Sequence, residues 1–396
     1  MLVLIANLGS TSFKYRLYRM DESGQEVLAK GGYERVSDYA SVIDDALATL
    51  QKDGVIASAD EIDAVGFKTV LGKDLSGCVF ADDSCVKALE DFAAVAPAHN
   101  PPYANGIRQF GKSLPHAKLV ALFETAFYQW VPAARSTYAL PKAWRDIGIR
   151  RYGFHGASHK FVAERSAELL GRNDVAASTA SLYINGPAPI AGKPLRVVSC
   201  HLGGSSSVTG IFNGVAIGTS MGFSPQSGLP QNNRVGDLDS GALPYAMKTL
   251  GISLEEAERQ LTKESGLQGV SGVSNDIRDI HAAKNEGNAD AALALAHLVD
   301  SIRHWVGSFA WQMGGIDALV FTAGIGENDY TVRKAVCEGL EEFGLVFDDA
   351  RNEACRAVEA ELSTADSKAK IFVIPANEEL VLAREVFRKV THNKIS

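Results

Sequence analysis

The sequence predicts an α/β protein with two similar lobes, and three observations support this prediction. The chain has 396 residues, which is long for one domain and sufficient for two lobes that each bury a core. A strand, a Gly/Ser turn and a second strand occur at the N-terminus and again in the middle of the chain. Elsewhere strands alternate with helices, as in α/β layering.

The first hairpin is expected at residues 2–18. An apolar run at 2–6 ends at Asn7, a Gly/Ser turn follows, and residues 13–18 alternate between apolar and polar side chains. The second copy has an apolar run at 195–200, then His201-Leu-Gly-Gly-Ser-Ser-Ser207, then further apolar residues. The repeat indicates a duplicated architecture whose hairpins face phosphate across a shared cleft, although two unrelated Gly/Ser hairpins could also look alike.

The segments between the hairpins complete the α/β pattern. Their periodicity predicts helices over 41–51, 158–170 and 290–312, and strands near 63–71, 117–123, 317–323 and 370–375. Residues 181–195 are punctuated by Gly and Pro and are expected to form a surface loop.

Composition excludes several classes of protein. A net charge of -8 and a pI near 5.7 argue against a nucleic-acid partner. The five cysteines are odd in number and contain no C-x-x-C pair, which favours free thiols in a reducing compartment. The first residues lack the features of a signal peptide, and no apolar run reaches the roughly 18 residues of a membrane span, so we expect no membrane association and a cytoplasmic location.

A nucleotide site is suggested by the strand at 317–323. It leads into Gly324-Ile-Gly326 and a helix expected to open near Asp329. Small residues there would let a nucleotide approach the backbone at the positive end of a helix, although such a turn can also be a plain connection. Neither a Walker A motif nor a complete G-x-G-x-x-G follows a predicted strand, so neither classical phosphate loop is expected.

A metal site is suggested at the end of the last strand. Glu378 follows this strand, where open α/β sheets bind ligands, and could hold magnesium together with Asn7. The alternative is that Glu378 only complements the dipole of the helix that it begins.

Two further segments carry cationic or hydrogen-bonding side chains. His155 and His159 could form a zinc pair, but Gly156 and the absence of an H-E-x-x-H glutamate favour a role beside an anion. The loop at 221–237 presents Arg234, the residue type that neutralises a transferring phosphoryl group, unless the loop is a simple connection.

Taken in order, ten short motifs resemble those of acetate kinases from residue 3 to residue 385. They are N-x-G-S-T-S-x-K at 7, H-N-P-P at 99, F-E-T-A-F at 123, R-R-Y-G-F-H-G-A-S-H at 150, H-L-G at 201, T-S-M-G-F-S-P at 219, G-L-P with R-x-G-D at 228–237, S-G-V-S-x-D-x-R at 271, F-T-A-G-I-G-E-N at 321 and I-P-x-N-E-E-L at 374.

The resemblance implies the duplicated two-lobed fold of the actin, sugar kinase and heat-shock ATPase superfamily, with the active site in the interlobe cleft. It implies a first lobe of 1–128 plus 380–396 and a second of 129–379. It also implies a homodimer that transfers the terminal phosphoryl group of ATP to a short-chain carboxylate, reversibly and with Mg²⁺.

The resemblance further assigns roles to residues by position. The residues implied in phosphoryl transfer are Glu124, His155 and Arg234, and those implied in binding magnesium are Asn7 and Glu378. The implied carboxylate site comprises Lys68, Val70, Ala98, Phe154 and Pro225. The nucleotide site comprises Lys14, His201, Leu202, Gly203, Gly204, Ser205, Asp276, Ile277, Arg278, Gly324, Ile325, Gly326, Glu327 and Asn328.

The chain departs from the family pattern at several of these positions. Lys68 replaces an arginine, Glu124 an aspartate and Gly204 an asparagine, while Ser205 brings a side chain where the family has glycine. Ala98 replaces a larger leucine, and a wider pocket would favour propionate or a longer acid by about 0.8 kcal/mol per buried methylene.

Two other functions stay open from the sequence. The departures at Lys68, Glu124 and Gly204 would also suit a nucleotide-binding protein that has lost turnover. The other is a kinase or phosphatase of the same superfamily that acts on another acceptor, including one that uses pyrophosphate in place of the nucleotide. The motif at 324–328 argues against pyrophosphate.

Overall fold

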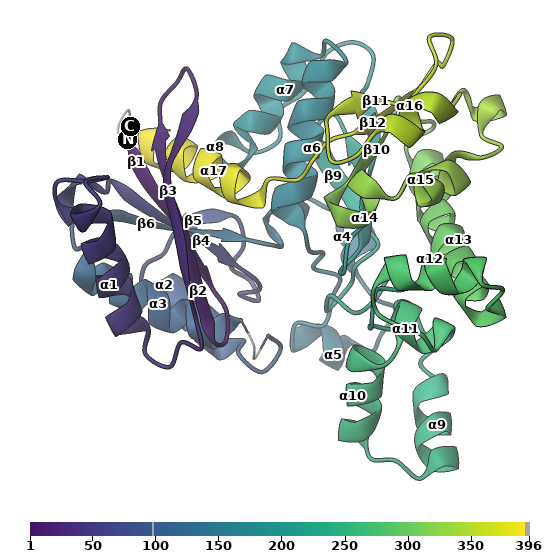
Figure 1. The fold of residues 1–396 in the computed structure, drawn as a ribbon, viewed down its shortest axis with the longest axis horizontal. Helices are drawn as coiled ribbons and strands as arrows, with labels where there is room; N and C mark the ends of the chain where they lie inside the picture. The colour runs from purple at the N-terminus through teal and green to yellow at the C-terminus, as the bar shows by residue number, and fades with distance from the viewer. Residues whose placement is uncertain (97–98, 393–396) are drawn as a thin grey trace.

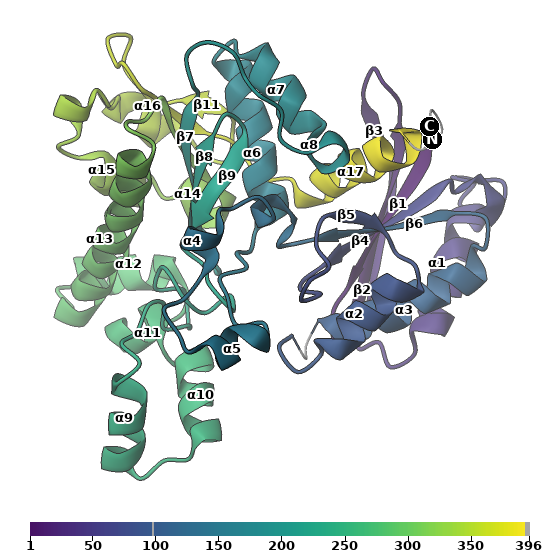
Figure 2. The same cartoon turned by 180° about the vertical axis from the view of Figure 1, so that it is seen from behind.

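The computed structural model describes residues 1–96 and 99–392, and it contains two six-stranded mixed sheets (Figures 1 and 2). The first sheet has the order β3-β2-β1-β4-β6-β5. Its strands are β1 (Leu2–Leu8), β2 (Ser12–Met20), β3 (Gln25–Glu34), β4 (Ala64–Thr69), β5 (Cys78–Phe80) and β6 (Lys118–Phe123).

The second sheet repeats this topology. It has the order β11-β12-β10-β7-β8-β9. Its strands are β7 (Arg196–His201), β8 (Ser207–Phe212), β9 (Val215–Thr219), β10 (Ala318–Thr322), β11 (Ala360–Glu361) and β12 (Lys370–Val373). In both sheets three antiparallel strands come first, two parallel strands follow, and a short antiparallel strand closes the edge. The structure therefore confirms the duplicated α/β architecture.

The two predicted hairpins occupy equivalent places in the two sheets. Asn7 pairs with Lys14 at the end of β1, and His201 pairs with Ser207 at the end of β7. Each hairpin also has a register shift between its second strand and the next one. The repeat seen in the sequence is therefore a repeat in the structure.

Helices cover both faces of the first sheet, and β4 shows why. Successive side chains of a strand point to opposite faces. Phe67 packs edge-to-face with Phe110 of α3 (Asn100–Ser113), whereas a Cβ on Gly66 would lie 2.7 Å from Val386 of α17 (Glu378–His392). The last helix thus returns to the first sheet, and the glycine allows it to approach closely.

The second sheet is covered in the same way. α6 (Gly156–Leu169) packs against β7 and β10, and α13 (Ala289–Gln312) packs against β7 and β8. A Cβ on Gly210 of β8 would meet the ring of Phe309 in α13 at 2.7 Å. α6 and α17 contact each other between the two sheets, as both views show (Figures 1 and 2).

The remaining helices lie at the edges and in the connections. The α-helices are α1 (Tyr39–Lys52), α2 (Asp83–Asp91), α4 (Ala133–Ser136), α5 (Lys142–Asp146), α7 (Asn173–Ala180), α8 (Leu182–Asn185), α9 (Ala242–Leu250), α10 (Leu254–Lys263), α11 (Gly266–Ser271), α12 (Ile277–Asn285), α14 (Ala323–Asn328), α15 (Tyr330–Cys337) and α16 (Asp349–Ala354). The 3-10 helices are η1 (Ala59–Glu61), η2 (Ala126–Tyr128) and η3 (Glu341–Phe343).

Most of the predicted elements are confirmed, and two expectations were wrong. Residues 181–195 contain the short helix α8 and are therefore not entirely loop. Gly324-Ile-Gly326 is not a turn but part of α14, whereas the helix expected near Asp329 is confirmed as α15, which Asp329 caps. Ala323 has a φ of 66°, so β10 turns directly into this helix, and the N–H groups of Ile325 and Gly326 donate to the Leu202 carbonyl.

Three further expectations concern the cysteines, a membrane span and the boundaries of the lobes. All five cysteines are free, as predicted, and all five are buried. Within residues 1–96 and 99–392, no helix has both the length and the apolar character that crossing a membrane requires. The boundaries 1–128 plus 380–396 and 129–379 stay predictions, and residues 393–396 lie outside the described part of the chain.

Candidate active site

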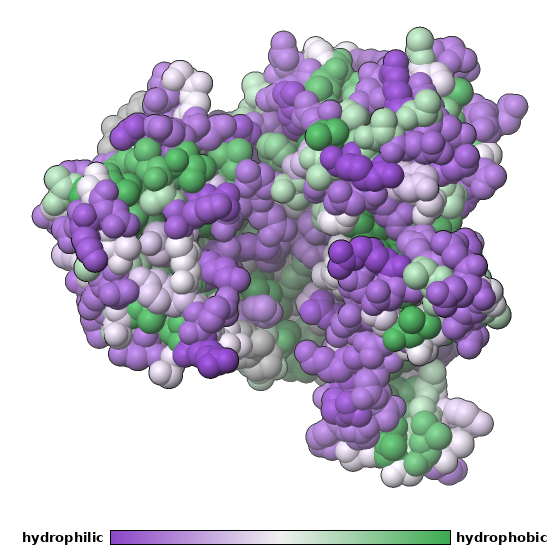
Figure 3. Space-filling model, viewed as in Figure 1, coloured by the Kyte–Doolittle hydropathy of each residue, from purple (hydrophilic) through white to green (hydrophobic). Residues whose placement is uncertain are grey.

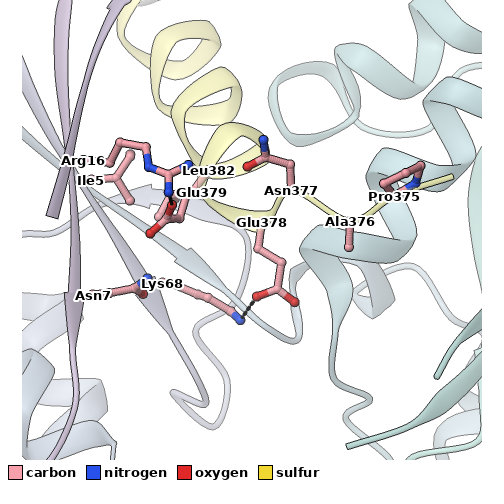
Figure 4. Close-up of a pocket in the computed structure, with 10 residues that line it drawn as sticks. All are labelled: Ile5, Asn7, Arg16, Lys68, Pro375, Ala376, Asn377, Glu378, Glu379 and Leu382. Carbon is pink, nitrogen blue, oxygen red and sulfur yellow. Dashed lines mark hydrogen bonds and ion pairs between the residues drawn. The ribbon is translucent and has the colours of Figure 1, made fainter. Parts of the chain in front are cut away.

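A polar cavity lies where the first sheet meets the start of α17. Its volume is about 550 Å³, and Figure 4 shows its lining by Ile5, Asn7, Arg16, Lys68, Pro375, Ala376, Asn377, Glu378, Glu379 and Leu382. In the space-filling view a hollow separates the two lobes (Figure 3). The predicted metal residues Asn7 and Glu378 therefore share one cavity with Lys68.

Lys68 is held between two carboxylates. Its ammonium lies 2.7 Å from Glu124 Oε1 and also donates to Glu378. Burial disfavours the charged ammonium, but the attraction of Glu124 and Glu378 outweighs it and raises the pKa of Lys68. An ammonium has three donors, so one N–H remains for a ligand.

The two carboxylates differ in their surroundings. Burial raises the pKa of Glu124, whose Oε2 is buried without a hydrogen-bond partner. Burial acts the same way on Glu378, but the charge of Lys68 outweighs it and lowers the pKa of this carboxyl. Together with the Asn7 amide, the site offers oxygen donors of the kind that Mg²⁺ prefers, one of them unused. These residues fit the metal, although no group of three His, Cys, Asp or Glu ligands occurs among the described residues.

An apolar cluster contains part of the predicted carboxylate site. Phe154 is buried with Leu71, Tyr152 and Met221, and Val70 packs against this cluster. Pro225 lies in the neighbouring loop, where its carbonyl accepts a hydrogen bond of 2.6 Å from Gln231. Ala98 lies outside the described residues, so the width of the pocket there stays a prediction.

His155 and His159 do not form a metal pair with each other, because the Ser207 hydroxyl lies between them and engages one ring nitrogen of each. His155 Nδ1 and His159 Nε2 each lie 2.8 Å from Ser207 Oγ. The His155 ring stacks on His201 with 4.1 Å between centroids. Burial, and then the neighbouring positive charges, hold the pKa of His155 well below 6.5. A neutral, hydrogen-bonding His155 is therefore favoured over a cationic one in these surroundings.

The backbone places His155 beside Glu124. His155 precedes α6 with a φ of 62°, a left-handed conformation that costs a residue with a side chain about 1–3 kcal/mol. The Gly156 N–H donates to the Glu124 carbonyl at 2.9 Å, and a Cβ on Gly156 would lie 2.4 Å from that oxygen. The glycine thus permits the close contact that brings the two predicted residues together.

Arg234 is a half-buried cation with no carboxylate partner among the described residues. Its Nη1 lies 3.4 Å from Ser205 Oγ and from Gln231 Oε1. Burial lowers its pKa, and no ion pair involving it occurs within the described ranges. A guanidinium without a counter-charge is a strong candidate to bind a carboxylate or phosphate.

A larger cavity of about 900 Å³ adjoins the second hairpin. Eight residues assigned to the nucleotide line it: Gly203, Gly204, Asp276, Ile277, Arg278, Gly324, Ile325 and Asn328. Nine further residues line it that were not predicted from the sequence: Asn232, Asn275, His281, Lys284, Asn285, Asp329, Tyr330, Thr331 and Arg356. One signal was available, because Ile277, His281 and Lys284 have the i, i+4, i+7 spacing of one helix face.

The other assigned nucleotide residues do not line this cavity. His201 Nδ1 lies 2.9 Å from Ser158 Oγ. The Gly326 N–H of α14 donates to the Leu202 carbonyl, which joins α14 to the segment that follows β7. Glu327 accepts from the Ala376 N–H at 2.8 Å, and Ser205 donates to Gln231. Lys14 forms an exposed ion pair of 3.2 Å with Glu34 at the end of the first hairpin.

The sequence is similar to those of known proteins along most of its length. The model of the Acetokinase family matches residues 32–384. Acetate kinase of Geobacillus kaustophilus (strain HTA426) is 40% identical over 410 residues, which cover 98% of each chain. Acetate kinase of Bacillus subtilis (strain 168) is 39% identical with the same coverage.

Solved structures show the same similarity. The acetate kinase of Porphyromonas gingivalis superposes with a TM-score of 0.88 and 35% identity, covering 98% of this chain and 99% of that one. A propionate kinase from Francisella tularensis subsp. tularensis SCHU S4 superposes with a TM-score of 0.83 and 30% identity, with the same coverage.

Proposed function

Since the chain belongs to the acetokinase family, we propose that it moves the terminal phosphoryl group of ATP onto acetate or propionate, and that the transfer runs in both directions. It is a kinase with a carboxyl group as acceptor. One observation carries the proposal beyond the family. Arg234, for which the described residues offer no carboxylate partner, bonds Ser205 next to the cavity that Gly203 and Gly204 line.

The chemistry needs positioning and charge neutralisation more than a strong base. A carboxylate is already a competent nucleophile, and the phosphoryl group spreads negative charge over its oxygens during transfer. Arg234 would bind these oxygens, and a neutral His155 would donate a hydrogen bond to them. When bound at Asn7 and Glu378, magnesium would supply further neutralisation of phosphate charge.

Lys68 takes a smaller part in this scheme than the resemblance suggested. Glu124 and Glu378 together offset its charge, and two of its three donors are engaged. We therefore assign the main attraction for the acceptor carboxylate to Arg234 and one hydrogen bond to Lys68. The apolar cluster around Phe154 would receive the alkyl group.

Several finer properties belong to the same proposal. We propose Mg²⁺ as the metal because the available donors are oxygens. The homodimer follows from the family resemblance alone. The cytoplasmic location is supported by five free thiols, which suit a reducing compartment.

The test is ATP-dependent formation of acyl phosphate, trapped as the hydroxamate, with acetate, propionate and butyrate and with magnesium present or chelated. The proposal expects turnover that requires magnesium and saturates with acetate or propionate. The neutralised Lys68 favours one alternative, a homologue that binds nucleotide without turnover. ATP binding without hydroxamate from any acid would select that alternative.

A further inference from the structure

Four side chains form a continuous line of hydrogen bonds from the interior of the second lobe to His155. Ser199 Oγ lies 2.8 Å from His159 Nδ1, and His159 Nε2 lies 2.8 Å from Ser207 Oγ. Ser207 Oγ in turn lies 2.8 Å from His155 Nδ1. The first three residues are fully buried, whereas His155 is only partly buried. The line therefore ends at a side chain of the candidate active site.

Three arrangements of protons make all three hydrogen bonds of this line, and the one in which Ser207 accepts from both histidines leaves the buried Ser207 proton without an acceptor among the described residues. The other two run the whole line in one direction. A neutral imidazole has one donor and one acceptor nitrogen, and each hydroxyl has a single proton. If Ser199 donates to His159, then His159 donates to Ser207, Ser207 donates to His155 Nδ1, and the proton of His155 is on Nε2. In the reverse direction His155 carries its proton on Nδ1, and Ser199 must accept.

The surroundings of Ser199 select the first direction. Ser199 is fully buried, and its hydroxyl has no hydrogen-bond partner other than His159 within the described ranges. In the reverse direction its proton would have no acceptor, and an unsatisfied buried donor is costly. In the first direction every proton of the line has an acceptor.

The free end of the line has the properties that a phosphoryl group requires. His155 Nε2 has no protein partner among the described residues and is not one of the buried polar atoms left unpaired, so it is accessible to a ligand. Lys68 and Arg234 lie close enough to the ring to influence its charge. Phosphate oxygens only accept hydrogen bonds, so the ring must offer N–H and not a lone pair.

We propose that Ser199, His159 and Ser207 are positioning residues that hold His155 as the tautomer with its proton on Nε2, aimed at the transferring phosphoryl group. The identity of the acceptor as a phosphoryl group rests on the proposed function. The tautomer of His155 does not depend on that function. Burial and the neighbouring histidine hold the pKa of His159 well below its usual value, which keeps this link of the line neutral. The line thus works as a fixed orientation device and moves no proton through its length.

The first test reads the tautomers directly in the wild-type protein. Protein labelled with ¹⁵N in its nine histidines is recorded by long-range ¹H–¹⁵N correlation near neutral pH, with resonances assigned by replacing each histidine in turn. We expect both His155 and His159 to carry their protons on Nε2. A proton on Nδ1 of His155 would overturn the proposal. Because no turnover is needed, this result stands apart from the proposed function.

The second test breaks the line at its central hydroxyl. Ser207→Ala is expected to give a mixture of His155 tautomers and to lower kcat about tenfold, the equivalent of one hydrogen bond, with little change in KM for the carboxylate. Ser207→Thr keeps a hydroxyl and should restore both readouts. Ser199→Ala breaks the buried end and should also mix the tautomers.

A matched control separates this effect from the loss of any buried hydroxyl. Ser166 is fully buried on the same helix as His159, and within residues 1–96 and 99–392 its hydroxyl bonds only the Ala163 carbonyl of that helix. Ser166→Ala should leave tautomers and kcat unchanged. The inference fails if Ser207→Ala keeps a single Nε2 tautomer, or if Ser166→Ala disturbs His155 equally. An inactive wild-type protein with both protons on Nε2 would reject the proposed function and leave the line intact.

Discussion

Lys68 and Glu124 face each other across two neighbouring parallel strands, with 2.7 Å between the ammonium and Oε1. The Glu124 N–H donates to the Thr69 carbonyl at 2.8 Å, so the backbone holds the pair in register. Both residues depart from the family pattern, and the longer carboxylate reaches the compact ammonium. The two changes therefore form one contact, and we expect them to depend on each other.

Shortening this carboxylate should reduce activity. Glu124→Asp withdraws the carboxylate by about 1 Å, which can cost about 100-fold in kcat/KM when nothing compensates. The change is measured by hydroxamate formation, with thermal unfolding as the check on stability. Glu90→Asp makes the same change in an exposed pair with Arg108 and should have no effect. Wild-type kcat/KM in Glu124→Asp would show that the distance is not important.

Removing the Arg234 guanidinium, which has no carboxylate partner in the part of the chain that the structure describes, should have the largest catalytic effect. Arg234→Ala leaves the transferring phosphoryl group without its main protein cation, and kcat should fall about 10³-fold. Arg259→Ala removes an exposed arginine of α10 that pairs with Glu256 and Glu264, and it controls for loss of charge alone. Steady-state kinetics decide the matter, and equal kcat values for the two variants would contradict the assignment.

A buried ion cluster between α6 and α17 should dominate the stability of the contact between the lobes. Lys160 lies 2.6 Å from Glu385, and Arg388 contacts both Glu385 and Glu164. Lys160→Met leaves a buried carboxylate with one cation fewer and should cost about 3 kcal/mol in the free energy of unfolding.

The control for this variant is an exposed lysine. Lys142→Met breaks an exposed pair with Asp146 and should cost less than about 0.5 kcal/mol. Urea denaturation measures both values. A loss for Lys160→Met no greater than that for Lys142→Met would mean that the cluster adds no stability.

Stability should decline as the pH falls below about 6.5, the usual pKa of histidine. Burial holds the pKa values of His155 and His159 well below this value and that of His201 at about 4. A lowered histidine pKa means that the unfolded chain binds more protons below pH 6.5, so acid favours unfolding. Each histidine contributes at most about 1.4 kcal/mol per pH unit until its folded pKa is reached.

The measurement is the free energy of unfolding from pH 7 to pH 5. His201→Gln should reduce the slope over this range. If the free energy of unfolding of the wild-type protein does not change between pH 7 and pH 5, these rings take up protons as readily in the folded protein as in the unfolded chain, which would contradict the prediction.

The sequence predicted the fold better than it predicted the contacts of the site. Strands, helices and the repeated hairpin follow from hydrophobic periodicity and turn residues, which act within a few positions of the chain. The segment at 324–326 was misassigned as a turn because a left-handed alanine is not visible in such a pattern. Arg356, a missed residue of the larger cavity, carries no local motif.

The sequence by itself determined the two hairpins, the order of the elements and the positions of the polar residues that end β1 and β7. Only the tertiary structure decided that Lys68 is shared with Glu378, 310 positions away, and that Ser207 joins His155 to His159. The reason is physical. Periodicity records which face of an element is buried, whereas the partner of a buried polar side chain is chosen by packing between distant elements.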